Sequence, residues 1–322
     1  MIVKINSRRY FLLLLSLVTG ALGLVCYNWY LKIHPAPPPA IGNQAARVFT
    51  TAKESSGEPY SFFVLGDSKG GYEVLESFLQ SIQNSRASFL VHLGDIVNYP
   101  TLDEHRYFIR EISETGFSKP IFVVPGNHDI NKDYPHSQEL FENLYGSTNF
   151  FFKFNGSLFV IGFCTNKKEF PNFLDFLEET LKSEASQVRY RFVFLHNLPV
   201  NFYPGKSIMD DPDAGRLLAL VERYKVNYVF AGNLHIYSRE VVANCVFLSP
   251  GSGGSLIRRK EVDPNYHCIE ITVSPERIGE KLYSIPLTYF IKDKEDYLDY
   301  LFQVKYLPRL KEKVRSLLSY LW

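Results

Sequence analysis

Five short hydrophobic runs along the chain each end in a cluster of polar residues. They occupy residues 62–70, 89–98, 121–129, 191–197 and 228–235. Their apolar parts are rich in Phe, Val, Ile and Leu, which favours buried strands. Because the carboxyl ends of parallel strands form the crevice where ligands bind, residues far apart in the sequence can meet there. The pattern therefore predicts one shared site built from the loops that follow these strands.

Helical and strand-like segments alternate around these runs. Residues 72–83 carry an apolar stripe at helical spacing, as an amphipathic surface helix does. Asn155-Gly156 predicts the turn of a β-hairpin. Further helices are predicted at about 102–115, 137–145, 172–184 and 213–224, and further strands at about 236–242, 245–249, 266–273 and 281–289. This order predicts an α/β fold with two packed sheets flanked by helices.

Composition limits the classes of function. The chain has 322 residues, 46% of them hydrophobic, and a formal net charge of +1. That length supports one sizeable domain or two. A nearly neutral chain does not attract nucleic acid as a bulk polyanion, so phosphate must be recognised locally. Cys245 and Cys268 are interpreted as buried free thiols, and a disulfide between them is the alternative in an oxidising compartment.

The amino-terminal segment has the composition of a signal or anchor. Lys4, Arg8 and Arg9 precede an uncharged stretch from Tyr10 to Leu31. Residues 1–31 are predicted to be a signal or a single membrane anchor, and 32–58 a linker. Ser-Arg-Arg at 7–9 also resembles a twin-arginine export signal. We expect an exported protein tethered to the outer face of the cytoplasmic membrane, or periplasmic if the segment is cleaved.

The remaining chain is divided into a main domain at 59–290 and a carboxyl-terminal extension at 291–322. The extension is predicted to be an amphipathic helix with a basic face. It can pack onto the domain or lie on a membrane surface, and packing is the commoner behaviour.

The polar clusters contain a set of metal-ligand side chains. Asp67 and Asp95 offer carboxylates, Asn127 an amide oxygen, and His196 and His235 imidazoles. Mixed oxygen and nitrogen ligands suit Mn, Fe or Zn better than Ca. A single carboxylate can bridge two cations, and Asp95 is the candidate for that role.

The clusters also resemble the ordered motifs of the calcineurin-like metallophosphoesterases. They read Asp67-Ser68-Lys69, Gly94-Asp95-Ile96-Val97-Asn98, Gly126-Asn127-His128-Asp129, His196 and Gly232-Asn233-Leu234-His235. The resemblance covers about residues 60–255, and Gly-Asn-His-Asp after a strand is its most specific part. It implies a four-layer α/β/β/α sandwich.

The same resemblance implies a reaction and a role for each matching residue. The reaction is hydrolysis of phosphate esters by a hydroxide that bridges two divalent ions. The first ion is expected on Asp67, Asp95 and His235, and the second on Asp95, Asn127 and His196. His128 is expected to protonate the leaving oxygen, with Asn98 orienting it. Lys69 and Asn197 are interpreted as substrate-binding residues.

Two positions depart from the family pattern. Lys69 stands where the first motif has a His, and Asn233 stands where the last motif has its first His. A protonated lysine has no lone pair for a metal, and the amide oxygen of Asn233 is a weaker ligand than imidazole. Two functions therefore stay open: a phosphoesterase with reduced metal affinity, or a non-catalytic module that binds a phosphate ligand or a protein.

Other polar residues have ordinary structural interpretations. His92, inside a strand, is interpreted as a hydrogen-bonded core histidine. His105, His136 and His267 lie outside the clusters and are expected on the surface or in loops. For Lys69 a solvated loop position is as good an interpretation as substrate contact.

The predicted location can be tested with a reporter fused after Trp322. The reporter is expected on the non-cytoplasmic side and in the membrane fraction, because basic residues precede the apolar stretch. Replacing Arg8 and Arg9 with Lys blocks export only if the twin-arginine interpretation is correct. Recovery of the intact chain from the cytosol contradicts the prediction.

Overall fold

The structure is a computed structural model of the whole chain. The residues described are Ser16, 18–20, 22–24, Cys26, 41–43, 59–165, 169–197, 211–257 and 262–287. Most of the predicted signal and linker segments, and all of the extension at 291–322, lie outside them. Within the described residues, no helix combines the length and the apolar character needed to cross a bilayer.

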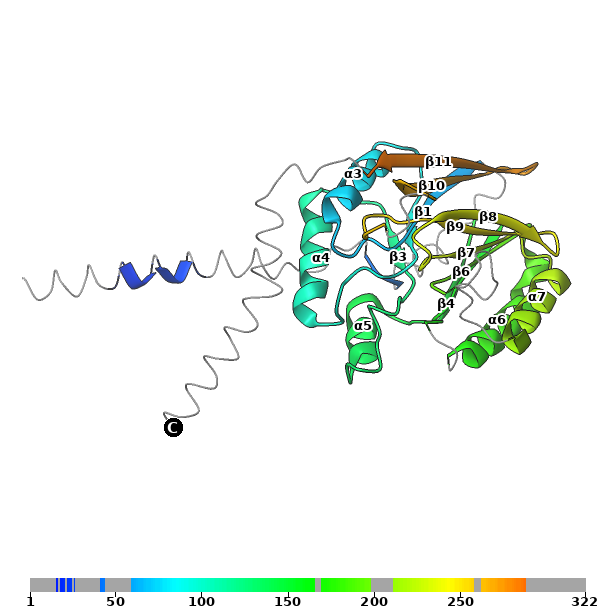
Figure 1. Cartoon of the computed structure of the whole chain (residues 1–322), viewed down its shortest axis with the longest axis horizontal. Helices are drawn as coiled ribbons and strands as arrows, with labels where there is room; N and C mark the ends of the chain where they lie inside the picture. The colour runs from blue at the N-terminus through cyan, green and yellow to red at the C-terminus, as the bar shows by residue number, and fades with distance from the viewer. Residues whose placement is uncertain are drawn as a thin grey trace, which may run out of the picture.

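Two mixed β-sheets form the centre of the domain (Figure 1). The five-stranded sheet has the order β11-β10-β1-β2-β3, with β1, β2 and β3 parallel and β10 and β11 antiparallel to their neighbours. Its strands are β1 (Tyr60–Leu65), β2 (Leu90–His92), β3 (Ile121–Val123), β10 (Asn265–Val273) and β11 (Ile278–Pro286).

The second sheet has six strands in the order β4-β5-β6-β7-β9-β8. Strands β5, β6, β7 and β9 are parallel, and the two edge strands run antiparallel to them. The strands are β4 (Phe150–Phe154), β5 (Ser157–Ile161), β6 (Tyr190–Leu195), β7 (Tyr228–Ala231), β8 (Tyr237–Val242) and β9 (Cys245–Pro250).

Helices cover the outer faces of the two sheets (Figure 1). The apolar residues of α3, α4 and α5 share one core with the five-stranded sheet, and those of α6 and α7 share another with the six-stranded sheet. The helices are α3 (Tyr72–Gln83), α4 (Leu102–Glu114), α5 (Ser137–Tyr145), α6 (Phe170–Glu184) and α7 (Asp211–Arg223), with a short 3-10 turn at Ala185–Gln187. The predicted α/β fold with two sheets is confirmed.

Strand side chains alternate between an outer core and the layer between the sheets, as the period of two requires. In β1, Phe63 and Leu65 face the helices, whereas Phe62 and Val64 face the other sheet. Phenylalanines dominate that central layer: Phe62, Phe89, Phe122, Phe152, Phe159, Phe192, Phe194 and Phe230.

Aromatic rings join the two sheets across this layer. The rings of Phe122 and Phe152 have centroids 4.4 Å apart, and those of Phe62 and Phe159 meet edge to face at 5.3 Å. Each pair links a residue of β1 or β3 to one of β4 or β5. Such pairs contribute about 0.5–1.5 kcal/mol beyond the burial of their surface. The layer therefore fixes how one sheet sits against the other.

A short part of the predicted linker packs on the domain. Ile41 forms a parallel bridge with Ile121 at the edge strand β3. The Asn43 side chain accepts a hydrogen bond from Val123 N (3.1 Å) and donates to Ser147 O (2.6 Å). Residues 41–43 are thus attached to the sheet edge.

The burial and partners of several His and Cys residues can be compared with their sequence interpretations. His92 is a buried core histidine, as predicted, and His136 is exposed before α5. The expectation for His105 and His267 was wrong, because both rings are buried and hydrogen-bonded, His105 to Tyr145 Oη at 3.1 Å. The cysteines Cys245 and Cys268 are free and buried, and so form no disulfide.

Neighbouring phenylalanines on β4 test the central layer. Phe152 is fully buried between the sheets, whereas Phe151 points outward and is 38% exposed. We expect Phe152→Ala to lower the free energy of unfolding by about 3–5 kcal/mol. The matched control Phe151→Ala should change it by about 0.5 kcal/mol or less. Urea denaturation measures both values, and equal losses would contradict the assignment of the faces.

Candidate functional site

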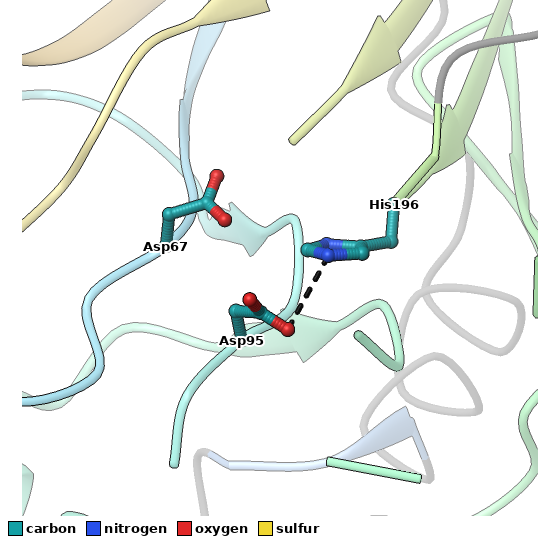
Figure 2. Close-up of side chains that lie close together, drawn as sticks. All are labelled: Asp67, Asp95 and His196. Atoms are coloured by element: carbon teal, nitrogen blue, oxygen red, sulfur yellow. Dashed lines mark ion pairs between the residues drawn. The ribbon is translucent and has the colours of Figure 1, made fainter. Parts of the chain in front are cut away.

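The predicted site residues lie in loops after strands of both sheets. Asp67 and Asp95 follow β1 and β2 of the five-stranded sheet, and Asn127 follows β3. His196 and His235 follow β6 and β7 of the six-stranded sheet. Asp67, Asp95 and His196 point into one common space, the carboxylates from one side and the imidazole from the other (Figure 2). One sheet carries the candidate oxygen ligands and the other the candidate nitrogen ligands.

Potential ligand atoms lie close together in this space. His196 Nε2 is 3.3 Å from Asp95 Oδ1 and 3.0 Å from Asn127 Oδ1. His235 Nε2 is 3.2 Å from Asp67 Oδ1. Ligand atoms of Asp67, Asp95 and His196 all lie within 4.8 Å of one another, and all three residues are buried.

Backbone carbonyls fix the tautomers of both histidines. His196 Nδ1 lies 2.7 Å from Leu93 O, and His235 Nδ1 lies 3.1 Å from Leu256 O. A carbonyl oxygen only accepts, so each Nδ1 carries the proton. In the neutral imidazole, Nε2 then presents its lone pair towards the carboxylates. A metal-ligating histidine is held by the same kind of outer hydrogen bond.

Four site residues adopt a left-handed backbone conformation. The φ angles are 56° for Asp67, 57° for Asp95, 63° for Asn233 and 56° for His235. Non-glycine residues rarely adopt this region, and Asn, Asp and His tolerate it best. Such local strain persists where the surrounding structure holds it, often at functional sites.

Two glycines allow the loops after β2 and β3 to touch. A Cβ on Gly94 would lie 2.6 Å from Gly126 N, and one on Gly126 would lie 2.3 Å from Asp95 N. Any side chain at these positions would therefore force the loops apart. The contact brings Asp95 and Asn127 to the same point.

Asp129 joins these two loops, and its role was missed from the sequence. Its Oδ2 accepts from Asp95 N and Gly126 N at 2.8 Å each. Its Oδ1 accepts from Ile96 N at 2.9 Å and Val97 N at 3.3 Å. Asp129 is the last residue of the Gly-Asn-His-Asp motif, which was the available signal. Its buried carboxylate fixes the backbone of both loops without belonging to the predicted ligands.

Buried charges of opposite sign stabilise one another here. Burial opposes ionisation of Asp67, but the charges of His235, His196 and Lys69 outweigh it and hold the pKa of that carboxyl below its usual value. His196 and Lys69 likewise overcome burial and lower the pKa of Asp95. Burial lowers the pKa of His235, but the charge of the neighbouring Asp67 raises it. The pKa of His235 is therefore above its usual value. Both carboxyl groups are therefore ionised at neutral pH.

Lys69 lies inside the cluster instead of in solvent. Its ammonium forms an ion pair with Asp95 Oδ2, and its side chain is only 13% exposed. The solvated-loop interpretation of Lys69 is therefore wrong. Asn233 contributes its backbone N–H, which donates to Asp67 Oδ2 at 2.9 Å.

The cluster opens into a cavity of about 720 Å³. Asp67 and His196 are fully buried beneath its lining. His128 Nδ1 donates to the backbone oxygen of Asn98 at 2.7 Å, so this carbonyl orients the ring. The predicted site residues in the lining are Lys69, Asp95, Asn98, Asn127, His128, Asn233 and His235.

Asn197 directly follows His196 in the sequence. It is buried, lies outside the described cavity lining, and donates from Nδ2 to Thr165 O. Another polar residue takes part without being predicted: Glu104 of α4 accepts from Asn98 N at 2.6 Å and Tyr99 N at 3.0 Å. Glu104 thereby holds the loop whose carbonyl orients His128.

These residues fit a divalent cation. Two ionised carboxylates, an amide oxygen and imidazoles with fixed tautomers are the donor types of Mn, Fe and Zn sites. Asp67 Oδ1 is buried and accepts no hydrogen bond from the described residues, and it faces His235 Nε2 at 3.2 Å, so a nearby positive charge would satisfy it.

The family model for the calcineurin-like phosphoesterases matches residues 60–237, more than half of the chain. The chain belongs to the calcineurin-like phosphoesterase family. No curated protein sequence matches it.

Solved structures share the fold at low identity. A purple acid phosphatase from yellow lupin (Lupinus luteus) matches with 14% identity and a TM-score of 0.58, over 76% of this chain and 56% of that chain. A dimetal phosphatase from Danio rerio matches with 11% identity and a TM-score of 0.53, over 71% and 99%. GAP50, the anchor in the inner membrane complex of Plasmodium, matches with 17% identity and a TM-score of 0.53, over 70% and 84%. The matched region thus spans about half of the lupin protein.

The role of Asp129 is tested by Asp129→Ala. The change leaves four backbone N–H groups without their acceptor, and we expect it to lower Mn²⁺ affinity about 10–100-fold, as loss of an outer hydrogen-bond partner does. Isothermal titration measures the affinity. Asp133→Ala is the matched control, because Asp133 is an exposed aspartate in the same loop region. Equal affinity in both variants would contradict the role of Asp129.

Proposed function

We propose that this protein hydrolyses phosphate esters with the help of divalent cation binding at the Asp67, Asp95 and His196 cluster. One observation carries the proposal: buried ligand atoms from both sheets converge at the floor of an open cavity. Membership of the phosphoesterase family supports the reaction class. The size and polarity of the lining suit a phosphate ester of a small molecule or of an exposed group on a larger one.

A bound divalent cation supplies Lewis-acid chemistry, because it offsets the charge that develops on the phosphoryl oxygens. The chain must hold the ligand atoms in place beforehand. His196 is positioned by Leu93 O and His235 by Leu256 O. Asp95 is positioned by the side-chain carboxylate of Asp129, which accepts from Asp95 N and Ile96 N. The ligands therefore need little reorganisation to bind.

His128 is the proposed proton donor to the leaving oxygen. It lines the cavity, and its Nδ1 is engaged with Asn98 O. In the imidazolium form, Nε2 then carries the proton that is transferred. Asn98 acts through its backbone carbonyl, which Glu104 holds by accepting from Asn98 N. This arrangement keeps the ring in one orientation.

We further propose that the enzyme acts outside the cytoplasm on a membrane tether. Lys4, Arg8 and Arg9 before the apolar stretch support this orientation. Together with the catalytic proposal, it implies an extracytoplasmic substrate.

Separate substitutions distinguish ligand from proton donor. Asp95→Ala should remove bound metal and abolish hydrolysis of a generic aryl phosphate. His128→Ala should retain the metal and lower turnover about a hundredfold, the usual scale for a general acid. Elemental analysis and an activity assay with Mn, Fe and Zn measure both effects. His136→Ala is the control for His128, since His136 is an exposed histidine. Loss of metal from His128→Ala would contradict the division of roles.

The alternative function is a non-catalytic module that binds a phosphate ligand or a protein. The ion pair between Lys69 and Asp95 favours it, because the ammonium engages an oxygen that a metal would use. Wild type that stays metal-free and inert at millimolar Mn supports this alternative and contradicts the catalytic one.

A further inference from the structure

We propose that the ammonium of Lys69 takes the place of one of the two expected metal ions, so that the centre binds a single divalent cation on Asp95, Asn127 and His196. The inference rests on the proposed function in one respect, that a divalent cation binds at this cluster at all. It replaces the expectation of two ions with one ion and one fixed side-chain charge.

The loop after β1 holds Lys69 in a fixed position. Lys69 N donates to Asp95 O at 3.0 Å, and Lys69 O accepts from Ser255 Oγ at 3.2 Å. The neighbouring Gly71 approaches Gly254 so closely that a Cβ on Gly71 would lie 2.0 Å from Gly254 O. The backbone is anchored on both sides of Lys69. The Lys69 side chain therefore lies in the cluster and not in solvent.

The carboxylate of Asp95 is divided between two partners. Its Oδ2 forms the ion pair with the Lys69 ammonium. Its Oδ1 faces His196 Nε2 at 3.3 Å and accepts from His128 N at 3.0 Å. The two oxygens of Asp95 therefore have different partners, the ammonium at Oδ2 and uncharged groups at Oδ1.

The two candidate ligand sets are unequal. On the Oδ1 side, Asp95, Asn127 and His196 bring three ligand atoms together, with His196 Nε2 3.0 Å from Asn127 Oδ1. On the Oδ2 side, His235 Nε2 faces Asp67 Oδ1 at 3.2 Å, and the remaining position is a lysine paired with Asp95. A protonated lysine donates hydrogen bonds but has no lone pair for a metal. The Oδ1 side is thus the one able to bind a cation.

The charge of the site agrees with a single cation. Two buried carboxylates, Asp67 and Asp95, face the ammonium of Lys69 and one dication. A second dication would lie beside the ammonium in a buried site, where like charges repel strongly because water screens them little.

The stoichiometry of Mn²⁺ tests this inference on the purified full chain. Protein is equilibrated with Mn²⁺, separated from free metal and analysed for manganese per chain. We expect one Mn²⁺ for wild type and two for Lys69→His, because imidazole replaces the ammonium with a ligand. The matched control is Lys132→His, which places the same substitution at an exposed lysine and should bind one.

Electron paramagnetic resonance of Mn²⁺-loaded wild type gives an answer that needs no variant. An isolated ion and an exchange-coupled pair have different hyperfine patterns, and the isolated pattern is expected. Two Mn²⁺ in wild type with a coupled spectrum, or a single Mn²⁺ in a folded Lys69→His, would overturn the inference and leave the phosphoesterase proposal standing. One Mn²⁺ without hydrolysis would support the inference and overturn the catalytic proposal. Absence of both metal and hydrolysis would overturn both.

Discussion

The packing of aromatic rings between the two sheets is the constraint on which the site depends. Carboxylates come from loops of the five-stranded sheet and imidazoles from loops of the six-stranded sheet, so their distances depend on how the sheets are placed. Rings such as Phe62 and Phe159, 5.3 Å apart, lock that placement. Because the interior is close-packed, sliding one sheet over the other would break the fit between their side chains. A hydrophobic layer thus sets the geometry of a polar centre.

The packing of the sheets brings the loops together, and hydrogen bonds to the loop backbone then fix the positions of the site residues. Asp129 accepts from Asp95 N and Gly126 N, and so joins the loops after β2 and β3 at the point where Gly94 and Gly126 touch. The left-handed backbone at Asp95 is kept in place by these contacts. The candidate ligand atoms are therefore held in place by the backbone of these loops.

Much of this could be predicted from the sequence, because strands and helices follow from periodic patterns and the motifs sit at strand ends. The hairpin at Asn155-Gly156 is one such element. Side-chain partners were harder to predict. His105 was expected on the surface or in a loop because it lies outside the polar clusters, yet its ring is buried and hydrogen-bonded to Tyr145 of α5. The ion pair between Lys69 and Asp95 depends on how closely the loops after β1 and β2 approach each other. The order of residues in the sequence does not reveal that approach. The same holds for Asp129, whose partners are backbone atoms.

The central claim is that side chains from two sheets form a site for a divalent cation beside a fixed ammonium. Crystals of the full chain grown with Mn²⁺, measured at a wavelength where manganese scatters anomalously, test it most directly. We expect one anomalous peak within coordination distance of Asp95 Oδ1, Asn127 Oδ1 and His196 Nε2, with Lys69 Nζ still on Asp95 Oδ2. A peak on Asp67 and His235 with Lys69 displaced, or no peak at the cluster, would contradict the account.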